Sequence, residues 1–315
     1  MMKIAEIANL IKNLKSTLIF THINPDGDTL SCAFALKYAL EKLNIKADIV
    51  SPDGIPKKFN ITKLFDKVLT EPQLGYEGYI SVDCSSEGQM GQPYKLFSRQ
   101  KLTINIDHHM SNTRYAKYNF VCNYSANAIN IYELIVALGV EIDEYLANTL
   151  LLGIITDTGN FAHSNTDTKT FEVAMELSKK GGNVARLNML LFKNQSKERA
   201  KLYIEVMQNI RYFEEDKVAL ITITQDMLKK HGLERSDTEG FIDFPLSIAG
   251  VEVALSVFED RRELYKISFR SKNVNVSEIA NFFGGGGHIN ASGAVIAGSY
   301  EEVIDKLIST TKRYI

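Results

Sequence analysis

Acidic and histidine side chains gather at four places in the first half of the chain. Residues 22–28 (HINPDGD) combine one imidazole with two carboxylates, and residues 107–109 (DHH) combine one carboxylate with two imidazoles. Two further acids, Asp83 and Asp157, each follow a run of mostly apolar residues. Carboxylate and imidazole groups without a thiolate suit manganese or magnesium and suit zinc less well. These residue types therefore indicate a site for divalent metal ions.

The elements that carry these residues are predicted to bring them together. Residues 17–22, 78–83 and 102–107 have the composition of short β-strands, and an acidic group lies at the carboxyl end of each. In an open parallel sheet, these ends form the edge at which ligands bind. Carboxylates crowded at one edge repel each other unless cations neutralise them. The ligands suffice for two ions that share a carboxylate, roughly 3.5–4 Å apart as in two-metal hydrolases.

The alternation of strand-like and helical segments predicts an α/β fold. Helical patterns follow the strands at residues 30–44, 126–139, 143–155 and 168–180. Because the strands are nearly continuous apolar runs, we expect a doubly wound, mostly parallel sheet in a first domain, residues 1–190. A linker containing a long charged helix is expected at residues 191–213. Three strand-like runs and two helical patterns then predict a second, smaller α/β domain at residues 214–315.

Length and composition exclude several classes of protein. A chain of 315 residues suits two domains, and its 45% hydrophobic and 23% charged residues are ordinary for a globular protein. No apolar run approaches the roughly 18–20 residues that span a bilayer, and the N-terminus does not resemble a signal peptide. A net charge of −2 argues against binding to long nucleic-acid duplexes. The three scattered cysteines predict neither disulfides nor a zinc ribbon, and they fit a reducing cytoplasm.

Each acidic place has a simpler explanation when it stands alone. Asp-Gly-Asp is a common turn sequence, a single acid such as Asp83 is often a helix cap, and adjacent histidines are often a surface feature. The Asp-Gly-Asp segment also loosely suggests the nucleophile of haloacid-dehalogenase phosphatases, but Leu30 occupies the Thr or Val position of that motif. The occurrence of all four places in this order favours a metal site.

The same residues carry a resemblance to a known family. Residues 22–28, Asp83, residues 107–109 and residues 157–159 (DTG) look like the four motifs of the DHH phosphoesterases. Near the end of the chain, residues 270–271 (RS), 284–288 (GGGGH) and 291–293 (ASG) resemble the DHH-associated domain of the first type. The match runs from about residue 15 to residue 297. The short two-domain form most resembles the nanoRNases, the branch of oligoribonucleases and pAp phosphatases.

The resemblance implies a two-metal centre. One ion would be held by His22, Asp26 and Asp83, and Asp83 would bridge to a second ion. The implied metal ligands are His22, Asp26, Asp28, Asp83, His108 and Asp157.

The resemblance also implies the residues that act in catalysis. Asp107 would orient a ligand from outside the coordination sphere, and His109 would face the scissile phosphate and stabilise its developing charge. The expected catalytic residues are therefore His109, Asp107 and Asp83, in a reaction in which two ions activate a water for attack on phosphorus.

The glycine run near the C-terminus has two explanations. It could be a flexible hinge, or a loop whose bare backbone lets a nucleotide approach closely. The resemblance favours the second, and Arg270 would then contact a phosphate or stack on a base. The implied substrate-binding residues are Arg270, Ser271, Gly284, Gly285, Gly286, Gly287 and His288. Ser31, Ala162 and Ser292 depart from the usual Gly, Arg and Ala of the family.

Together these observations predict a cytoplasmic phosphoesterase with two divalent ions, manganese or magnesium. We expect it to hydrolyse short oligoribonucleotides to mononucleotides and 3′-phosphoadenosine 5′-phosphate (pAp) to AMP. The nearest rival is a phosphodiesterase for cyclic or linear dinucleotides, and a rival of another class is a catalytically idle nucleotide sensor. A pyrophosphatase fits the glycine–histidine segment less well, and a RecJ-like DNA exonuclease would need more chain. The expected partner is short RNA or a nucleotide, without long duplexes or membranes, and a homodimer is left open.

Overall fold

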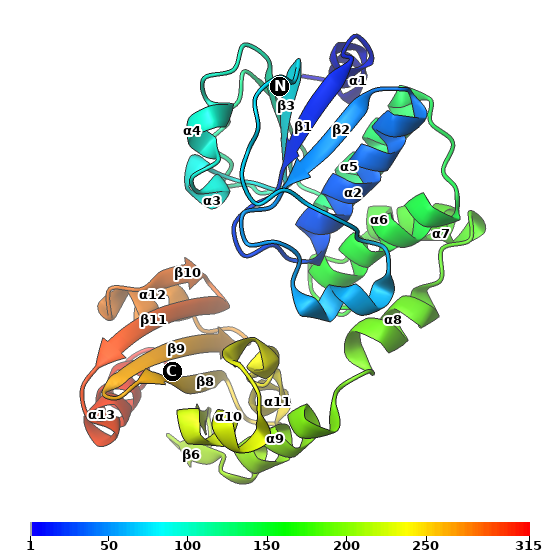
Figure 1. Ribbon diagram of the computed structural model, residues 1–315. Coiled ribbons are helices and arrows are strands. Elements are labelled where there is room, and N and C mark those ends of the chain that lie inside the picture. Colours follow the sequence, from blue (N-terminus) through cyan, green and yellow to red (C-terminus); the bar gives the residue numbers. More distant parts are fainter. Residues whose placement is uncertain (1) are drawn as a thin grey trace. The chain divides into compact units, whose positions relative to one another are not determined.

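The computed structural model describes residues 2–315, which divide into two units between Asn194 and Gln195. Figure 1 shows the first unit in blue to green and the second in yellow-green to red. None of the helices in residues 2–315 is long and apolar enough to cross a membrane.

Five parallel strands form the sheet of the first unit, in the order β2-β1-β3-β4-β5. They are β1 (Ser16–Phe20), β2 (Lys46–Val50), β3 (Gly78–Val82), β4 (Thr103–Asp107) and β5 (Tyr118–Val121). The chain passes from β1 to β2 on one side and then returns to the other side of β1 with β3. The strand order therefore reverses at β1 and β3, where sheets of this kind form a ligand crevice beyond their carboxyl ends. The predicted parallel sheet is confirmed.

Helices cover both faces of this sheet, as the doubly wound prediction requires. On one face, α1, α2, α5 and α6 pack over Ile19 and Ile80, and on the other face α3 and α4 pack near Leu18 and Phe20. Successive residues of β1 point to opposite faces, and both faces are buried, which explains the consecutive apolar residues Leu18–Phe20. The helices are α1 (Ile4–Lys12), α2 (Gly27–Lys42), α3 (Glu87–Met90), α4 (Tyr94–Phe97), α5 (Asn127–Leu138), α6 (Glu144–Asp157), α7 (Thr168–Lys179), α8 (Val184–Phe192) and the 3₁₀ helix η1 (Lys57–Thr62).

The second unit is built on a mixed sheet of six strands, in the order β10-β11-β9-β8-β7-β6, in which only β7 and β8 pair in parallel. The strands are β6 (Arg211–Phe213), β7 (Val218–Ile223), β8 (Val253–Arg261), β9 (Leu264–Ser271), β10 (Gly286–His288) and β11 (Ala291–Ala297). The helices are α9 (Lys197–Gln208), α10 (Gln225–His231), α11 (Asp243–Ser247), α12 (Val276–Phe282), α13 (Tyr300–Thr311) and η2 (Arg235–Thr238).

The two faces of this second sheet differ in how far they are covered. Helices α12 and α13 pack over one face and form its main core. On the other face, α9 and α10 cover β7 and β8 through a smaller core that includes Leu202 and Ile221. Farther along the same face, Val295 of β11 is 53% exposed and His288 of β10 is also exposed. We call this exposed part, formed by β9, β11 and β10, the open face.

The predicted linker helix lies within the second unit. Helix α9 is capped by Ser196, whose hydroxyl accepts a hydrogen bond from the backbone N–H of Arg199. Its Leu202 and Val206, one helical turn apart, are fully buried against residues of β7, β8 and α10. The charged sequence of this helix thus conceals an apolar stripe that belongs to a core.

The glycine run, expected from the sequence to be a loop, is partly a strand. Gly286–His288 form β10, which pairs antiparallel with β11. A Cβ on Gly285 would lie 2.1 Å from the carbonyl oxygen of Gly293, and a Cβ on Gly287 would lie 2.6 Å from that of Ala291. Gly287 also has a φ of +146°, which L side chains rarely adopt. Two of the four glycines are therefore required by the approach of β10 to β11.

Candidate metal centre

The six predicted metal ligands meet at the carboxyl edge of the parallel sheet. His22 follows β1, and Asp26 is the N-cap of α2, where its Oδ1 accepts hydrogen bonds from the N–H groups of Asp28 and Thr29. Asp83 follows β3. The remaining ligands are Asp28, in the first turn of α2, His108, directly after β4, and Asp157, the last residue of α6. Three sets of side chains each have donor atoms within 4.8 Å of one another: His22, Asp26 and Asp83; Asp28, His108 and Asp157; and Asp83, His108 and His109, which shares residues with the other two.

Asp83 belongs to two of these sets, and its carboxylate faces both His22 and His108. Its Oδ2 is 3.7 Å from Nε2 of His22, and its Oδ1 is 3.4 Å from Nε2 of His108. Two more contacts complete the arrangement, at 3.6 Å from His22 Nε2 to Asp26 Oδ1 and 3.7 Å from His108 Nε2 to Asp157 Oδ2. These distances exceed the usual ~3.2 Å limit of a hydrogen bond. They approach the roughly 3–3.5 Å between two ligands that each lie ~2.1 Å from one ion.

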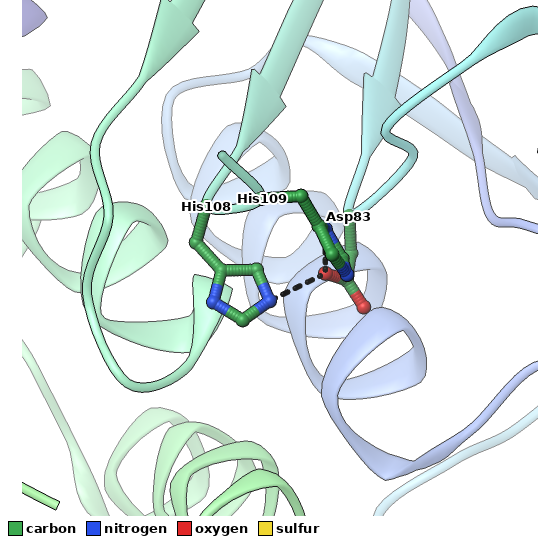
Figure 2. Close-up of side chains that lie close together, drawn as sticks. All are labelled: Asp83, His108 and His109. Atoms are coloured by element: carbon green, nitrogen blue, oxygen red, sulfur yellow. Dashed lines mark ion pairs between the residues drawn. The ribbon is translucent and has the colours of Figure 1, made fainter. Parts of the chain in front are cut away.

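A buried atom of Asp83 points to the same conclusion. Asp83 is 3% exposed, yet its Oδ1 atom has no hydrogen-bond partner anywhere in residues 2–315. A buried carboxylate oxygen without a partner is costly unless a cation takes the place of the missing donor. Figure 2 shows this carboxylate between the two rings that follow β4. The residues present therefore fit a metal site with Asp83 in a bridging position.

Both histidine ligands are oriented by backbone carbonyl groups. Nδ1 of His22 lies 2.8 Å from the carbonyl oxygen of Ile23, and Nδ1 of His108 lies 2.9 Å from that of Tyr124. Because a carbonyl can only accept, each Nδ1 must carry the hydrogen. Nε2, the nitrogen that faces the carboxylates, is then left as the metal ligand.

Asp28 is held from behind by the start of α5. Its Oδ2 accepts a hydrogen bond from the N–H of Asn127 at 2.5 Å, and its Oδ1 accepts one from the N–H of Ala128 at 2.9 Å. These are the first two residues of α5, so the positive end of the helix dipole also favours the carboxylate. Gly153 of α6 leaves the room for it, since a Cβ there would lie 2.6 Å from Asp28 Oδ1.

A buried network of amide side chains lies behind His109. Nδ1 of His109 is 2.8 Å from Oδ1 of Asp107, and Nδ2 of Asn112 donates to Oδ2 of Asp107 at 2.6 Å. Nδ2 of Asn112 also contacts Asn105 Oδ1, and Nδ2 of Asn105 donates to the carbonyl oxygen of Cys84 at 3.1 Å. Asp107 is fully buried and uses its oxygens for these contacts, so it fits the predicted role of orienting His109.

The same network supports an unusual backbone conformation at Asp83. The φ angle of Asp83 is +57°, in the left-handed region, where Asp and Asn are among the better tolerated residues. The carbonyl oxygen of the next residue, Cys84, accepts from Asn105 and, at 3.3 Å, from Asn112. Backbone strain of this kind commonly occurs at functional sites.

The electrostatics of the ion-free centre reflect its excess of negative charge. Burial disfavours the imidazolium form, yet contacts with Asp26 and Asp83 raise the pKa of His22 to about 11. Burial also disfavours the charged form of His108, but the carboxylates of Asp83, Asp28 and Asp157 outweigh this effect and raise the pKa of His108 to about 11. Burial raises the pKa of Asp157 to about 7; the charge of His108 counteracts this shift, and the charge of Asp83 adds to it. Without a cation, the centre therefore retains protons.

The pKa values of two further residues, Asp28 and His109, are shifted in ways that affect the chemistry of the centre. Burial and the charges of Asp83 and Asp157 raise the pKa of Asp28 well above its usual range, as expected for a carboxylate that lacks a neutralising ion. Burial opposes protonation of His109, but its hydrogen bond to Asp107 raises the pKa of His109 above its ordinary value. His109 can thus carry positive charge next to the metal ligands.

The predicted substrate residues lie in the second unit and point in different directions. Arg270 and Ser271 are neighbours on β9, so their side chains project from opposite faces of the sheet. Ser271 is buried on the core side, where its hydroxyl donates to the carbonyl oxygen of Val274. Arg270 pairs in register with Ala291, which in turn pairs with His288. Arg270 and His288 therefore share the open face, and Ser271 lies on the other face.

Sequence reasoning missed the residues that support the ligands. Asn112 and Asn105 act through hydrogen bonds to Asp107 and to a carbonyl group, and Asn127 acts through its backbone N–H. The spacing of Asn112, three residues beyond His109, was the one local signal for its role. The other contacts depend on the tertiary fold, so no pattern in the sequence could indicate them.

Comparisons with known proteins agree with this geometry. Residues 16–154 match the family model of the DHH family N-terminal domain, and residues 215–315 match that of the DHHA1 domain. A bifunctional oligoribonuclease and PAP phosphatase from Thermus thermophilus is 30% identical, over 96% of this chain and 93% of that protein. A protein of the same description from Mycoplasma pneumoniae is also 30% identical, over 93% and 91%. The crystal structure of an exopolyphosphatase-related protein from Bacteroides fragilis has a TM-score of 0.92 at 23% identity, covering 99% of this chain and 96% of that one, which shows a common fold.

Proposed function

Because this chain belongs to the DHH family of phosphoesterases and ends in a DHHA1 domain, we propose that it hydrolyses short oligoribonucleotides to mononucleotides and pAp to AMP. The observation that carries the proposal is Asp83, whose two carboxylate oxygens face His22 and His108. The choice of substrates is supported by relatives that are described as bifunctional oligoribonucleases and PAP phosphatases and match nearly the whole chain.

The grouping of the residues in the centre suggests which ion each ligand would hold. His22, Asp26 and Asp83 would hold one ion, and Asp83 would bridge to a second ion. The second ion would be completed by Asp28, His108 and Asp157. When bound, the two ions generate a nucleophile at neutral pH and neutralise charge on the phosphate. We propose manganese, because imidazole and carboxylate ligands occur together here without a thiolate, and magnesium is the alternative.

His109 is the residue we propose to act on the substrate itself. Its Nδ1 is engaged by Asp107, so its Nε2 is free for the scissile phosphate. Because the hydrogen bond to Asp107 favours the charged ring, His109 can donate a proton or a hydrogen bond to a phosphate oxygen. Asp107 holds the ring in this orientation and is itself held by Asn112.

The open face of the second unit is the proposed binding surface for the rest of the substrate. It combines the guanidinium of Arg270 with the imidazole of His288, which lie in register across β9, β11 and β10. The small residue Ala291 lies between them, and Gly293 follows on the same face of β11, so both leave room for a flat base or a ribose. The glycines at 284–287 would let a nucleotide approach the backbone of this edge. Ser271 is not part of this surface, and we propose that it serves the fold.

The cellular compartment of the protein is also a proposal. The cysteines Cys32, Cys84 and Cys122 are all free, which supports a reducing compartment such as the cytoplasm. The proposed partners are short RNA and nucleotides. A homodimer stays a prediction that sedimentation of the metal-loaded protein can test.

A substrate panel with product analysis tests the proposed function. The full-length protein would be assayed in manganese and then in magnesium with RNA of two to five nucleotides, pAp, a cyclic dinucleotide and pyrophosphate. We expect mononucleotides from the RNA, AMP from pAp, and loss of both products with a chelator. Preferential cleavage of the cyclic dinucleotide would favour the rival phosphodiesterase. Metal binding without turnover of any substrate would favour a nucleotide sensor.

A further inference from the structure

Two asparagines of α5, Asn127 and Asn130, lie behind the metal ligands. Both are fully buried, in a helix whose other buried residues are all apolar. Nδ2 of Asn127 donates to the carbonyl oxygen of Ile106 at 3.0 Å, and Nδ2 of Asn130 donates to that of Asp107 at 3.1 Å. Ile106 and Asp107 are the last two residues of β4, and His108 follows them. Helix α5 is therefore fastened to the end of the strand that presents His108.

Asn130 also fastens the segment that orients the ring of His108. Its Nδ2 lies 3.1 Å from the carbonyl oxygen of Cys122, which follows β5, and 3.0 Å from Oδ1 of Asn127. The same Cys122 carbonyl accepts from the N–H of Tyr124 at 2.8 Å, and the carbonyl of Tyr124 in turn contacts Nδ1 of His108. One amide group thus holds together the end of β4, the end of β5 and the first turn of α5.

The same turn of α5 holds Asp28. The carboxylate of Asp28 accepts hydrogen bonds from the two backbone N–H groups that begin α5. The thiol of Cys32 lies 3.6 Å from Oδ1 of Asp28 and 3.5 Å from Nδ2 of Asn127. Asp28 and His108 belong, with Asp157, to the set proposed to complete the second ion. Two ligands from different elements are therefore fixed relative to each other through α5.

Packing alone does not explain an asparagine at position 130. Its Oδ1 has no hydrogen-bond partner within residues 2–315, whereas its Nδ2 faces three acceptors. A buried amide oxygen without a donor costs free energy that an apolar side chain of similar size would avoid. The contribution of Asn130 therefore lies in its donors, and these act on segments that carry or orient metal ligands.

The contacts of Asn130 favour one ion over the other. The ligands proposed for the first ion, His22, Asp26 and Asp83, follow β1 and β3 or cap α2. In the part of the chain that the structure describes, the side chain of Asn130 forms no hydrogen bond with any of these three residues. Loss of its amide should loosen the ligands of the second ion and leave those of the first in place.

We propose that Asn130 is a positioning residue that decides whether the centre holds one ion or two. It sets the distance between Asp28 and His108 before an ion arrives. The inference rests on the proposed function for the two ions, whereas the preformed support rests on the hydrogen bonds alone. Because Asn130 contacts neither of these ligands' side chains, excess metal should compensate for its loss, as it could not for the loss of a ligand.

Metal counting tests the proposal with Asn130→Leu, which keeps the size of the side chain and removes the donors. In equilibrium dialysis of the full-length protein against manganese, the variant should bind the second ion about ten- to a hundredfold more weakly and the first ion as the wild type does. At an intermediate manganese concentration, the EPR spectrum should change from that of a magnetically coupled pair to that of an isolated ion. Turnover at this concentration should fall with KM unchanged, and it should recover when manganese is raised.

Two further variants guard against a general loss of stability. Leu138→Ala removes buried apolar volume at the other end of α5 and is the matched control, which should still bind both ions. Asn130→Ser keeps one donor and should weaken the second ion less than Asn130→Leu, so it serves if the leucine variant does not fold. Wild-type affinity for the second ion in the variant that folds, or equal weakening of both ions, overturns the proposal.

A measurement without metal separates the inference from the proposed function. In NMR spectra of the chelated wild type, the side-chain amide protons of Asn130 should exchange slowly with solvent, because the support is preformed. Rapid exchange overturns the proposal whatever the substrate. A protein that shows slow exchange and the Asn130-dependent second ion, but cleaves neither short RNA nor pAp, refutes the substrate assignment and retains the inference.

Discussion

Asp83 combines two demands in one residue, because in the proposed centre it would bridge two ions and it also adopts a left-handed backbone conformation. Its acidic side chain could be recognised from the sequence, since it ends an apolar strand. Its φ of +57° could not, because the conformation depends on donors from Asn105 and Asn112 to the next carbonyl group. The chemistry of the ligands is thus readable from residue types, whereas their support comes from tertiary contacts.

The first prediction uses this distinction. Asp83→Asn keeps the shape of the side chain and tolerates the left-handed conformation, but it removes the charge that bridges the ions. We expect turnover to fall by roughly a hundredfold or more, with the fold retained. The ion-free variant should have a higher Tm than the ion-free wild type, because one of several crowded carboxylates is gone. Circular dichroism and a manganese-dependent assay provide the measurements, and activity near the wild-type level would contradict the bridging role.

Protons compete with metal ions for this centre, which gives a second prediction. The raised pKa values, about 11 for His22 and His108 and about 7 for Asp157, mean that ion binding must displace protons. Each raised pKa stabilises the ion-free fold at pH values below the group's ordinary pKa. That stabilisation is lost between about pH 4 and 7 for Asp157 and between about 6.5 and 11 for the histidines. The ion-free protein should therefore become less stable, and metal affinity should rise, as the pH increases.

Thermal unfolding at several pH values measures this competition. The difference in Tm between manganese-loaded and chelated protein should widen from about pH 6 to about pH 9. A constant difference over that range would show that the histidines do not exchange protons for metal.

Asn112 supports the third prediction. If its amide orients His109 through Asp107, Asn112→Ala should lower kcat by about ten- to a hundredfold while KM and metal stoichiometry change little. The buried donor that is lost should also cost about 1–3 kcal/mol of stability. ¹⁵N NMR of His109 should show the ring losing its preference for hydrogen on Nδ1. Asn209→Ala, whose amide contacts only Glu205 of its own helix, is the control. A stability loss without change in kcat or in the NMR signals would mean a purely structural role.

At the scale of elements, the strands and helices around the centre could be predicted because each carries a clear period. Strands β1, β3 and β4 largely lie within the strand-like runs of the sequence, and α2, α5, α6 and α7 follow the predicted helical patterns closely. The three-residue strands β6 and β10 could not be predicted, since they are too short for a period and β10 contains two glycines. They form only because neighbouring strands offer hydrogen-bond partners.

The contact between α2 and α6 gives the fourth prediction. A methyl group from Gly153→Ala would meet Asp28 Oδ1 at 2.6 Å and Ala128 Cβ at 2.8 Å, and Asp28 is already held by α5. The helices must separate, so we expect a loss of about 1–3 kcal/mol in stability and weaker metal binding. Gly88→Ala in α3 is the matched control, because a Cβ there meets only a distant hydroxyl and should be neutral or slightly stabilising. Unchanged manganese affinity in Gly153→Ala would show that this contact does not position Asp28.

At the scale of the whole molecule, we propose that the two units divide the work between chemistry and recognition. The sequence indicated that a second unit follows the first, because the pattern of its strand-like segments changes. It did not indicate that α9 belongs to the second core, because a mostly charged sequence hides the stripe formed by Leu202 and Val206. The division between Asn194 and Gln195 falls within residues 191–213, the segment that the sequence suggested as a linker.

The fifth prediction tests this division. Arg270→Ala should reduce kcat/KM for a dinucleotide by on the order of ten- to a hundredfold, through a lost charge-assisted contact. It should reduce hydrolysis of bis-(p-nitrophenyl) phosphate far less, because that small ester has no nucleotide for the second unit to bind. Asp28→Ala should abolish both reactions. Equal losses of both substrates in Arg270→Ala would mean that the second unit does not recognise the nucleotide.

The close approach of α2 to α6 has a consequence for ion size. Gly27 faces Thr156 across this contact and Gly153 faces Asp28, with no room for even one additional methyl group on either side. The spacing between the ligands at the ends of these helices is therefore set by side chains packed directly against the two glycines, which leave little room for adjustment. Calcium prefers ligands at about 2.3–2.6 Å, compared with about 2.0–2.1 Å for magnesium, and selects flexible sites. A frame that cannot expand should discriminate against calcium by its radius, even though the carboxylates in it are ligands that calcium accepts.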